Sequence, residues 1–160
     1  MDIYTVAFFG HRRLSDIFAL EEQLIEILRE LVMTKEYVEF LVGRDGDFDQ
    51  LAASTVRSVI RNYGNGNASL ILILPYDRAE YRDNKVSFED YYDEVQICYE
   101  SSIAHPKAAI EVRNRQMIDR SDLVICAVEH SGGAEKAMRY ALRQGKKVIN
   151  LLGNKQDCPL

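Results

Sequence analysis

Short apolar runs that alternate with segments of helical periodicity constrain the fold of this chain more than any other feature. The apolar runs span residues 3–9, 38–42, 69–74, 94–99, 122–128 and 147–152. Their apolar residues follow one another, without the alternation of a strand that has one face in water. Buried strands that alternate with helices form a mostly parallel sheet covered by helices on both faces. We therefore expect a single doubly wound, Rossmann-like α/β sheet.

The segments between these runs carry the start and stop signals of helices. Helices are expected over residues 17–33, 48–63, 106–119 and 133–144. Pro106 suits the first position of its helix, where a backbone N–H would have no partner in the helix. Residues 76–93 are rich in tyrosine and charge and have little periodicity. We expect an irregular excursion there, with one short helix near residues 86–92 and tyrosines that cover the sheet edge or form a dimer contact.

Length and composition fit one domain. The chain has 160 residues, a net charge of −5 and three widely spaced cysteines, Cys98, Cys126 and Cys158. This number and spacing fit neither a disulfide framework nor a zinc site, so we expect a cytoplasmic protein with no metal and no cofactor. No apolar run reaches membrane-spanning length. We expect one Rossmann-like domain over residues 1–153 and a frayed tail over residues 154–160.

The candidate site lies where the strands end, because ligands of such sheets bind beyond the carboxyl ends of the strands at the switch point. Three loops follow strands there, at residues 10–13, 43–49 and 129–135. In the last loop a glycine pair opens a helix, which presents free N–H groups and the positive end of the helix dipole to an anion. The candidate ligand-binding residues are Gly10, His11, Arg12, Gly43, Asp45, Gly46, Asp49, Arg113, Asn114, Gly132 and Gly133.

Several of these residues have two interpretations. Arg12 is either a solvated turn residue or a fork-shaped partner for phosphate or carboxylate, and His11 is either structural or an acid or base. Asp49 lies in a first helical turn, where an acid is favoured by the dipole but also suits a ribose hydroxyl. Arg113 shares a helix face with Met117, which places it near the sheet if Met117 is buried.

Four patches of this sequence together resemble the SLOG superfamily, the Rossmann-like group that contains the LOG, DprA and small YpsA-like proteins. The patches are Phe9-Gly10-His11-Arg12, residues 43–53, residues 113–117 with Ser121-Asp122, and Ser131-Gly132-Gly133-Ala134. The short length and the Gly-His-Arg start look most like the YpsA-like branch. The resemblance implies a Rossmann-like fold with a ligand cleft at the strand ends.

The resemblance also implies where a catalytic pair would lie. In LOG-type enzymes, an arginine on the helix before the strand that leads to the glycine motif works with a glutamate on the helix after that strand. The arginine motif has a methionine four residues after the arginine and an aspartate five residues further, and here Arg113, Met117 and Asp122 keep that spacing. The glutamate of the second motif falls on Ala137, which cannot protonate a leaving base or stabilise an oxocarbenium ion. Arg113 and Glu135 are therefore the catalytic candidates, and the catalytic residues stay undetermined.

Three functions are compatible with these patterns. We expect first a protein that binds a nucleotide or a nucleotide-derived anion and acts as a sensor or regulator. The alternative is cleavage or transfer of the N-glycosidic bond of a nucleoside monophosphate, with Glu135 or Glu111 as substitute acid and a helix similar to that of nucleoside deoxyribosyltransferases. The third is DprA-like binding of single-stranded DNA along a strip formed by Arg12, Arg13, Arg113, Arg115, Arg139 and Arg143. Because the net charge is acidic, we expect a nucleotide-like small molecule as partner rather than nucleic acid or a membrane, and a homo-oligomer is compatible with the sequence.

Overall fold

The computed structural model of the chain describes residues 1–153. Within them the strands are β1 (Ile3–Gly10), β2 (Tyr37–Val42), β3 (Ala68–Leu74), β4 (Glu94–Ile97), β5 (Leu123–Ala127) and β6 (Lys147–Asn150). The helices are α1 (Ile17–Thr34), α2 (Asp47–Tyr63), α3 (Ala79–Asp83), α4 (Lys85–Tyr91), α5 (Tyr99–Ser102), α6 (Ala109–Asp119) and α7 (Gly133–Arg143). Residues 154–160, which we predicted to be a frayed tail, lie outside the described residues.

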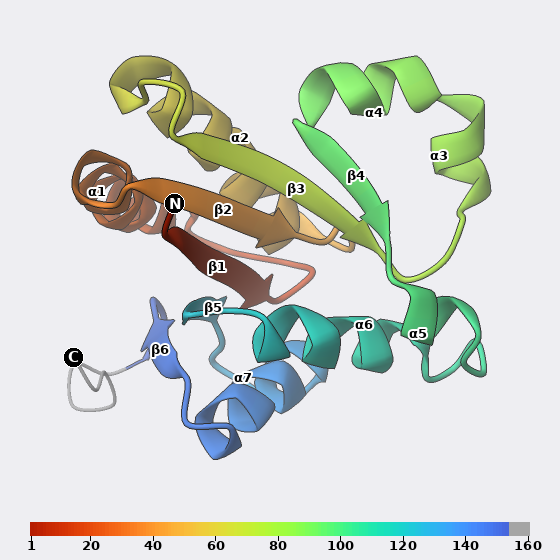
Figure 1. Cartoon of the computed structure of the whole chain (residues 1–160). Helices are drawn as coiled ribbons and strands as arrows, with labels where there is room; N and C mark the ends of the chain where they lie inside the picture. The colour runs from red at the N-terminus through yellow and green to blue at the C-terminus, as the bar shows by residue number, and fades with distance from the viewer. Residues whose placement is uncertain (154–160) are drawn as a thin grey trace.

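The strands form one sheet in the order β4-β3-β2-β1-β5-β6 (Figure 1). Every neighbouring pair is parallel. The chain builds outward from β1 to β4 on one side and then returns to the other side for β5 and β6. The topological switch point therefore lies between β1 and β5, at their carboxyl ends. The predicted α/β fold class, a doubly wound parallel sheet, is confirmed.

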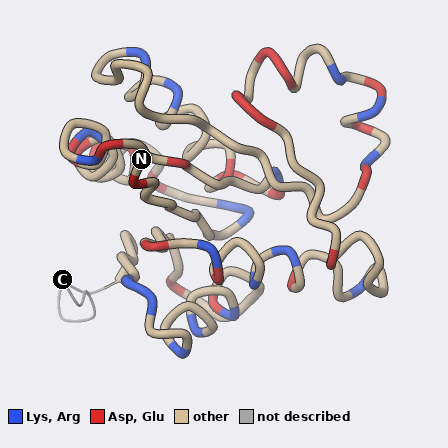
Figure 2. Tube along the Cα trace, viewed as in Figure 1, with Lys and Arg blue, Asp and Glu red and all other residues tan. Residues whose placement is uncertain are grey.

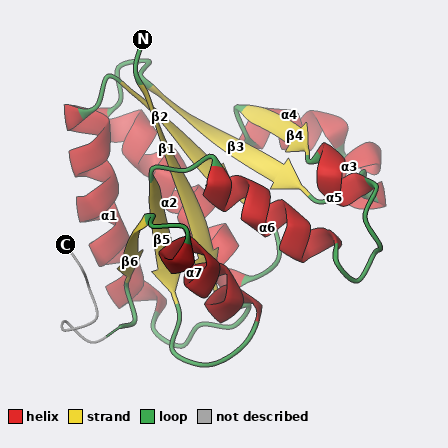
Figure 3. Ribbon diagram, turned by 60° about the horizontal axis from the view of Figure 1, so that its bottom comes forward, coloured by secondary structure: helices red, strands yellow, loops and turns green. Residues whose placement is uncertain are grey.

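Helices cover both faces of the sheet (Figure 3). Buried residues of α1 and α2 pack on one face in a cluster that includes Leu24, Phe48 and the strand residue Phe40. Met117 of α6 and Ala141 of α7 pack on the other face. Because the inner strands β1, β3 and β5 are covered on both sides, their residues are mostly apolar without alternation, as the sequence pattern indicated. The edge strand β4 is different, since its residues are exposed or only partly buried. In residues 1–153 we find no helix with the length and hydropathy needed to cross a membrane.

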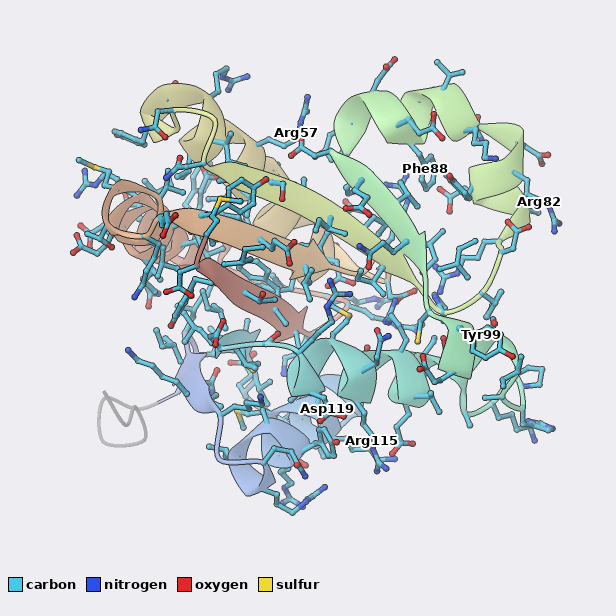
Figure 4. The ribbon with its side chains drawn as sticks, viewed as in Figure 1. Arg57, Arg82, Phe88, Tyr99, Arg115 and Asp119 are labelled. Carbon is cyan, nitrogen blue, oxygen red and sulfur yellow. The ribbon has the colours of Figure 1, made fainter. Side chains whose placement is uncertain are left out.

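The excursion between β3 and β4 is more regular than expected. It contains two short helices, α3 and α4, where we predicted one. Tyr81, Phe88 and Tyr92 are buried there and join the same core cluster as α1 and α2, and Figure 4 shows Phe88 inside the curve of the two helices. The two helices have five and seven residues, fewer than the window of about 11–18 residues in which helical periodicity is read, so periodicity does not reveal them. Part of the tyrosine-rich segment is therefore core.

Three predicted element boundaries were wrong. The helix expected from Pro106 begins at Ala109, because residues 105–108 form a turn in which Ala108 N–H donates to the His105 carbonyl oxygen at 2.8 Å. The fixed φ of proline suits a turn as well as a first helical position. The strand expected over residues 94–99 ends at Ile97, and the strand expected over residues 147–152 ends at Asn150.

Candidate functional site

The loops after β1, β2 and β5 meet in one cleft at the switch point. The cleft has a volume of about 460 Å³. Apart from Gly46, all the predicted ligand-binding residues line it. The other residues that line it are Phe8, Phe9, Arg13, Ile110, Met117, His130 and Ala134.

The loop after β1 is held in place by the start of α2. Asp47 N–H donates to the Arg12 carbonyl oxygen at 2.9 Å, and the Asp47 carboxylate accepts from Leu14 N–H at 3.0 Å. Gly10 packs directly on the side chain of Phe48, so that a Cβ atom at Gly10 would clash with it. Phe48 N–H also donates to the His11 carbonyl oxygen, at 3.4 Å, so these two N–H groups at the start of α2 bond to the first loop.

Gly46 does not line the cleft. It is the N-cap residue of α2, and its backbone packs against Arg12 so closely that a side chain would clash with the Arg12 backbone. Its contact with Arg12 brings the first loop and α2 together. The structure thus gives Gly46 a packing position beside the cleft.

A group of charged side chains forms one wall of the cleft. Arg113 is only 3% exposed, and its Nη2 donates to Asp45 at 2.9 Å while its Nη1 donates to the Ile73 carbonyl oxygen at 3.2 Å. The second carboxylate oxygen of Asp45 accepts from Arg78 at 2.9 Å. Burial opposes ionisation of Asp45, but the charges and hydrogen bonds of Arg113 and Arg78 outweigh it and lower the pKa of Asp45.

Asp49 lies behind this ion pair. Its carboxylate accepts a hydrogen bond from Asp45 N–H at 2.8 Å. A Cβ atom at Gly43 would lie 3.0 Å from Asp49 Oδ2 and 3.1 Å from Arg113 Nη1, so Gly43 leaves room for both side chains. Burial raises the pKa of Asp49 to about 6, although the Asp45 N–H and the Arg113 charge act in the opposite direction. Asp49 therefore changes its charge in a mildly acidic range.

Two histidines that line the cleft stack on each other. The rings of His11 and His130 lie 3.6 Å apart at an interplanar angle of 4°. His11 Nε2 accepts from Glu129 N–H at 2.9 Å, which requires a neutral ring with its proton on Nδ1. Burial and the neighbouring His130 lower the pKa of His11, which favours that neutral form. His130 was missed in the sequence because nothing local marks a ring that stacks on a residue 119 positions away.

The free donors of the cleft come from α7 and from the first loop. Gly132 has a φ of 151°, which favours glycine, and lets the chain turn into α7. In the part of the chain that the structure describes, no acceptor bonds to the N–H groups of residues 133–135. Arg12 and Arg13 are exposed and have no ion pair within residues 1–153. N–H groups of this kind and two guanidinium groups are suited to a phosphate group.

The catalytic candidate Glu135 does not line the cleft. Its carboxylate pairs with Arg139 at 3.3 Å on the surface of α7. Ala137, the position of the LOG-type glutamate, is 5% exposed and packs in the core. Glu111 pairs with Arg115 at 2.9 Å outside the cleft. Among the described residues, the carboxylates that line the cleft are those of Asp45 and Asp49.

An all-parallel sheet with a cleft at its switch point defines this chain as a Rossmann-like α/β protein. No protein-family model matches the chain, and no curated protein sequence is similar to it. Solved structures are similar. DNA processing protein A from Helicobacter pylori, described for its single-stranded DNA binding mode, has 21% identity and a TM-score of 0.63 over 91% of this chain and 63% of that chain. DNA processing protein A (DprA) from Streptococcus pneumoniae has 18% identity and a TM-score of 0.68 over 97% of this chain and 52% of that chain.

These neighbours are DprA proteins, and the fold of this chain is similar to theirs. The chain spans between about half and two thirds of their lengths. They contradict the prediction that nucleic acid is an unexpected partner, because the Helicobacter pylori protein is described as binding single-stranded DNA. Net charge is a weak argument against such a partner, because it averages over the whole surface and does not give the local field at a site.

Proposed function

We propose that this protein binds single-stranded DNA and that a backbone phosphate lies in the cleft at the switch point. The observation that carries this proposal is the set of free donors there: the N–H groups that open α7 and the guanidinium groups of Arg12 and Arg13 line one cavity. Helix N-termini and arginine side chains are the usual phosphate ligands of DNA-binding proteins. The DprA-type fold of the chain agrees with this assignment.

The cleft favours a single strand over a duplex. A volume of about 460 Å³ suits one nucleotide unit. His130 is exposed, and one face of its ring is covered by His11, so a base would approach the ring from the face turned away from His11. Bases of single strands stack on aromatic rings of this kind. We infer that the base next to the bound phosphate stacks on His130.

Fluorescence anisotropy with a labelled dT15 oligonucleotide tests the proposal. We expect binding at low salt, with log K falling linearly against log salt concentration. Replacement of Arg12 and Arg13 by alanine should weaken binding by at least about tenfold, since each charge-assisted hydrogen bond contributes about 1.5–3 kcal/mol. Arg29→Ala with Arg61→Ala, on α1 and in the last turn of α2, is the matched control and should bind like the parent. No binding even at low salt would refute the proposal.

A second candidate is the binding of a free nucleotide, as a sensor would do. The size of the cleft supports it, since about 460 Å³ lies in the range of small-molecule sites. Thermal-shift measurements with nucleotides separate the two candidates, because a ligand raises the melting temperature by mass action.

Three other expectations from the sequence stay predictions. Assignment to the YpsA-like branch within the SLOG group rests on chain length and the Gly10-His11-Arg12 start. The single-domain boundary at residue 153 and a cytoplasmic location are the other two.

A further inference from the structure

A second hollow adjoins the cleft, and most of its charged lining residues are basic. It lies between α6 and α7 and has a volume of about 410 Å³; we call it the α6–α7 groove. Ile110, Asn114 and Gly133 line both the groove and the cleft. The two hollows are therefore continuous, and the groove begins where the free N–H groups of α7 lie.

The charge of the groove is opposite to that of the whole chain. Its basic lining residues are Lys107, Arg115, Lys136, Arg139 and Arg143, whereas Glu111 is its one acidic lining residue. Figure 2 shows the basic positions along α6 and α7. In a chain with a net charge of −5, such a concentration makes a local field that attracts anions.

The charges of the groove are only partly neutralised. Arg115 pairs with Glu111 at 2.9 Å and Arg139 pairs with Glu135 at 3.3 Å, but both arginines are more than half exposed. Exposed pairs of this kind contribute little and exchange readily for another anion. Within residues 1–153, the groove residues Lys107, Lys136 and Arg143 have no ion pair.

The groove also has a fixed aromatic element. The hydroxyl group of Tyr140 donates to Asp119 at 2.7 Å, which holds the ring between the two helices. The guanidinium carbon of Arg115 lies 5.1 Å from the centre of this ring. Figure 4 shows Arg115 and Asp119 on α6 beside α7. A guanidinium group held over a ring is a known platform for the bases of single-stranded nucleic acids.

We propose that the α6–α7 groove is the second half of the DNA site, and that the strand leaves the cleft over Gly133 and follows α7 toward Arg143. This inference rests on the proposed function. The groove fits an extended polyanion because its charges are spread along the helix: Lys136 and Arg143 lie two turns apart on the same face. The 11 residues of α7 span about 16 Å, or about five nucleotides at a stacked spacing of about 3.4 Å.

The test uses the full chain and labelled oligonucleotides of two lengths, dT3 and dT15. The groove variant combines Lys136→Glu and Arg143→Glu, and a control of equal charge combines Arg29→Glu and Arg61→Glu on α1 and α2, which cover the opposite face of the sheet. We expect the groove variant to bind dT3 like the control and dT15 at least tenfold more weakly. The slope of log K against log salt concentration for dT15 should become shallower by about 1.4, since two phosphate contacts are lost.

The outcomes separate the two proposals. If the parent protein binds neither oligonucleotide, the proposed function fails and the groove assignment falls with it. If the parent binds dT15 but the groove variant and the control have equal affinity and salt slope, only the groove assignment is overturned. Tighter binding of a labelled polyglutamate peptide than of dT15 to the parent would overturn the assignment of the groove to nucleic acid. A circular dichroism spectrum of each variant confirms that it is folded.

Discussion

Arg113 and Asp45 form an ion pair of 2.9 Å although 68 residues separate them in the sequence. The pair joins α6, on one face of the sheet, to the loop after β2 that leads into α2 on the other face. Arg113 is also bonded to the carbonyl oxygen of Ile73 near the end of β3. This ion pair therefore fixes the wall of the cleft to both layers of helices.

Removal of Asp45 should destabilise the protein strongly. Asp45→Ala leaves the buried guanidinium group of Arg113 without its carboxylate, and an unpaired buried charge costs about 3–5 kcal/mol. Urea denaturation at pH 7 measures the loss. Asp77→Ala, which removes the exposed partner of Arg82, is the control and should change stability by about 0–1 kcal/mol. Similar losses in the two variants would contradict a buried ion pair at the cleft.

Asp49 should make folding stability depend on pH between about 4 and 6. Its folded pKa of about 6 lies above the unfolded value, so the folded state binds the proton more tightly. The resulting stabilisation of the folded state is full below the unfolded pKa and is lost as the pH rises through 6. Its size is about 1.4 kcal/mol for each unit by which the folded and unfolded pKa values differ. Asp49→Asn should remove this pH dependence and make the variant more stable than the parent at pH 7.

Urea denaturation of the parent and of Asp49→Asn at pH 4, 5, 6 and 7 gives this difference directly. The variant is a suitable comparison because the amide oxygen of asparagine still accepts from Asp45 N–H. Effects of other titrating groups cancel between the two proteins. Parallel curves of stability against pH would show that Asp49 titrates normally.

Gly10 should not tolerate a side chain. Gly10→Ala places a Cβ atom against the fully buried ring of Phe48, and overpacking of this kind costs about 1–3 kcal/mol. Gly133→Ala is the matched control, because nothing lies within 4 Å of the added methyl group, and it should be neutral or stabilising by up to about 1 kcal/mol. Thermal unfolding compares the two variants. A neutral Gly10→Ala would mean that the first loop and α2 are not packed closely.

His11 should be neutral at pH 7, with Nε2 unprotonated. Burial and the neighbouring His130 lower the pKa of His11. The neutral His11 ring therefore makes its full contribution to folding stability above the unfolded pKa of about 6.5, and this contribution is lost as the pH falls below that value. Two-dimensional ¹H–¹⁵N NMR of the imidazole nitrogens reports both the tautomer and the pKa. Because Glu129 N–H would lose its acceptor, its resonance should move in the same titration. A proton on Nε2 at pH 7 would contradict the structure.

The sequence by itself determined the parallel sheet, its cover of helices and the edge at which a ligand would bind. Uniformly apolar strands require cover on both faces, and the carboxyl ends of parallel strands lie at one edge, so the loops after β1, β2 and β5 had to meet there. The spacing of Arg113 and Met117 also indicated correctly that Arg113 lies near the sheet, because residues four apart share a helix face.

Only the tertiary structure decided which partner each residue at that edge contacts. It assigned the N–H groups at the start of α2 to the first loop, gave Arg113 to Asp45, stacked His130 on His11 and turned Glu135 toward Arg139. The physical reason is the distance along the chain over which each kind of interaction acts. Periodicity and capping are local, whereas ion pairs, ring stacking and burial depend on residues that the crossovers bring together from distant parts of the chain.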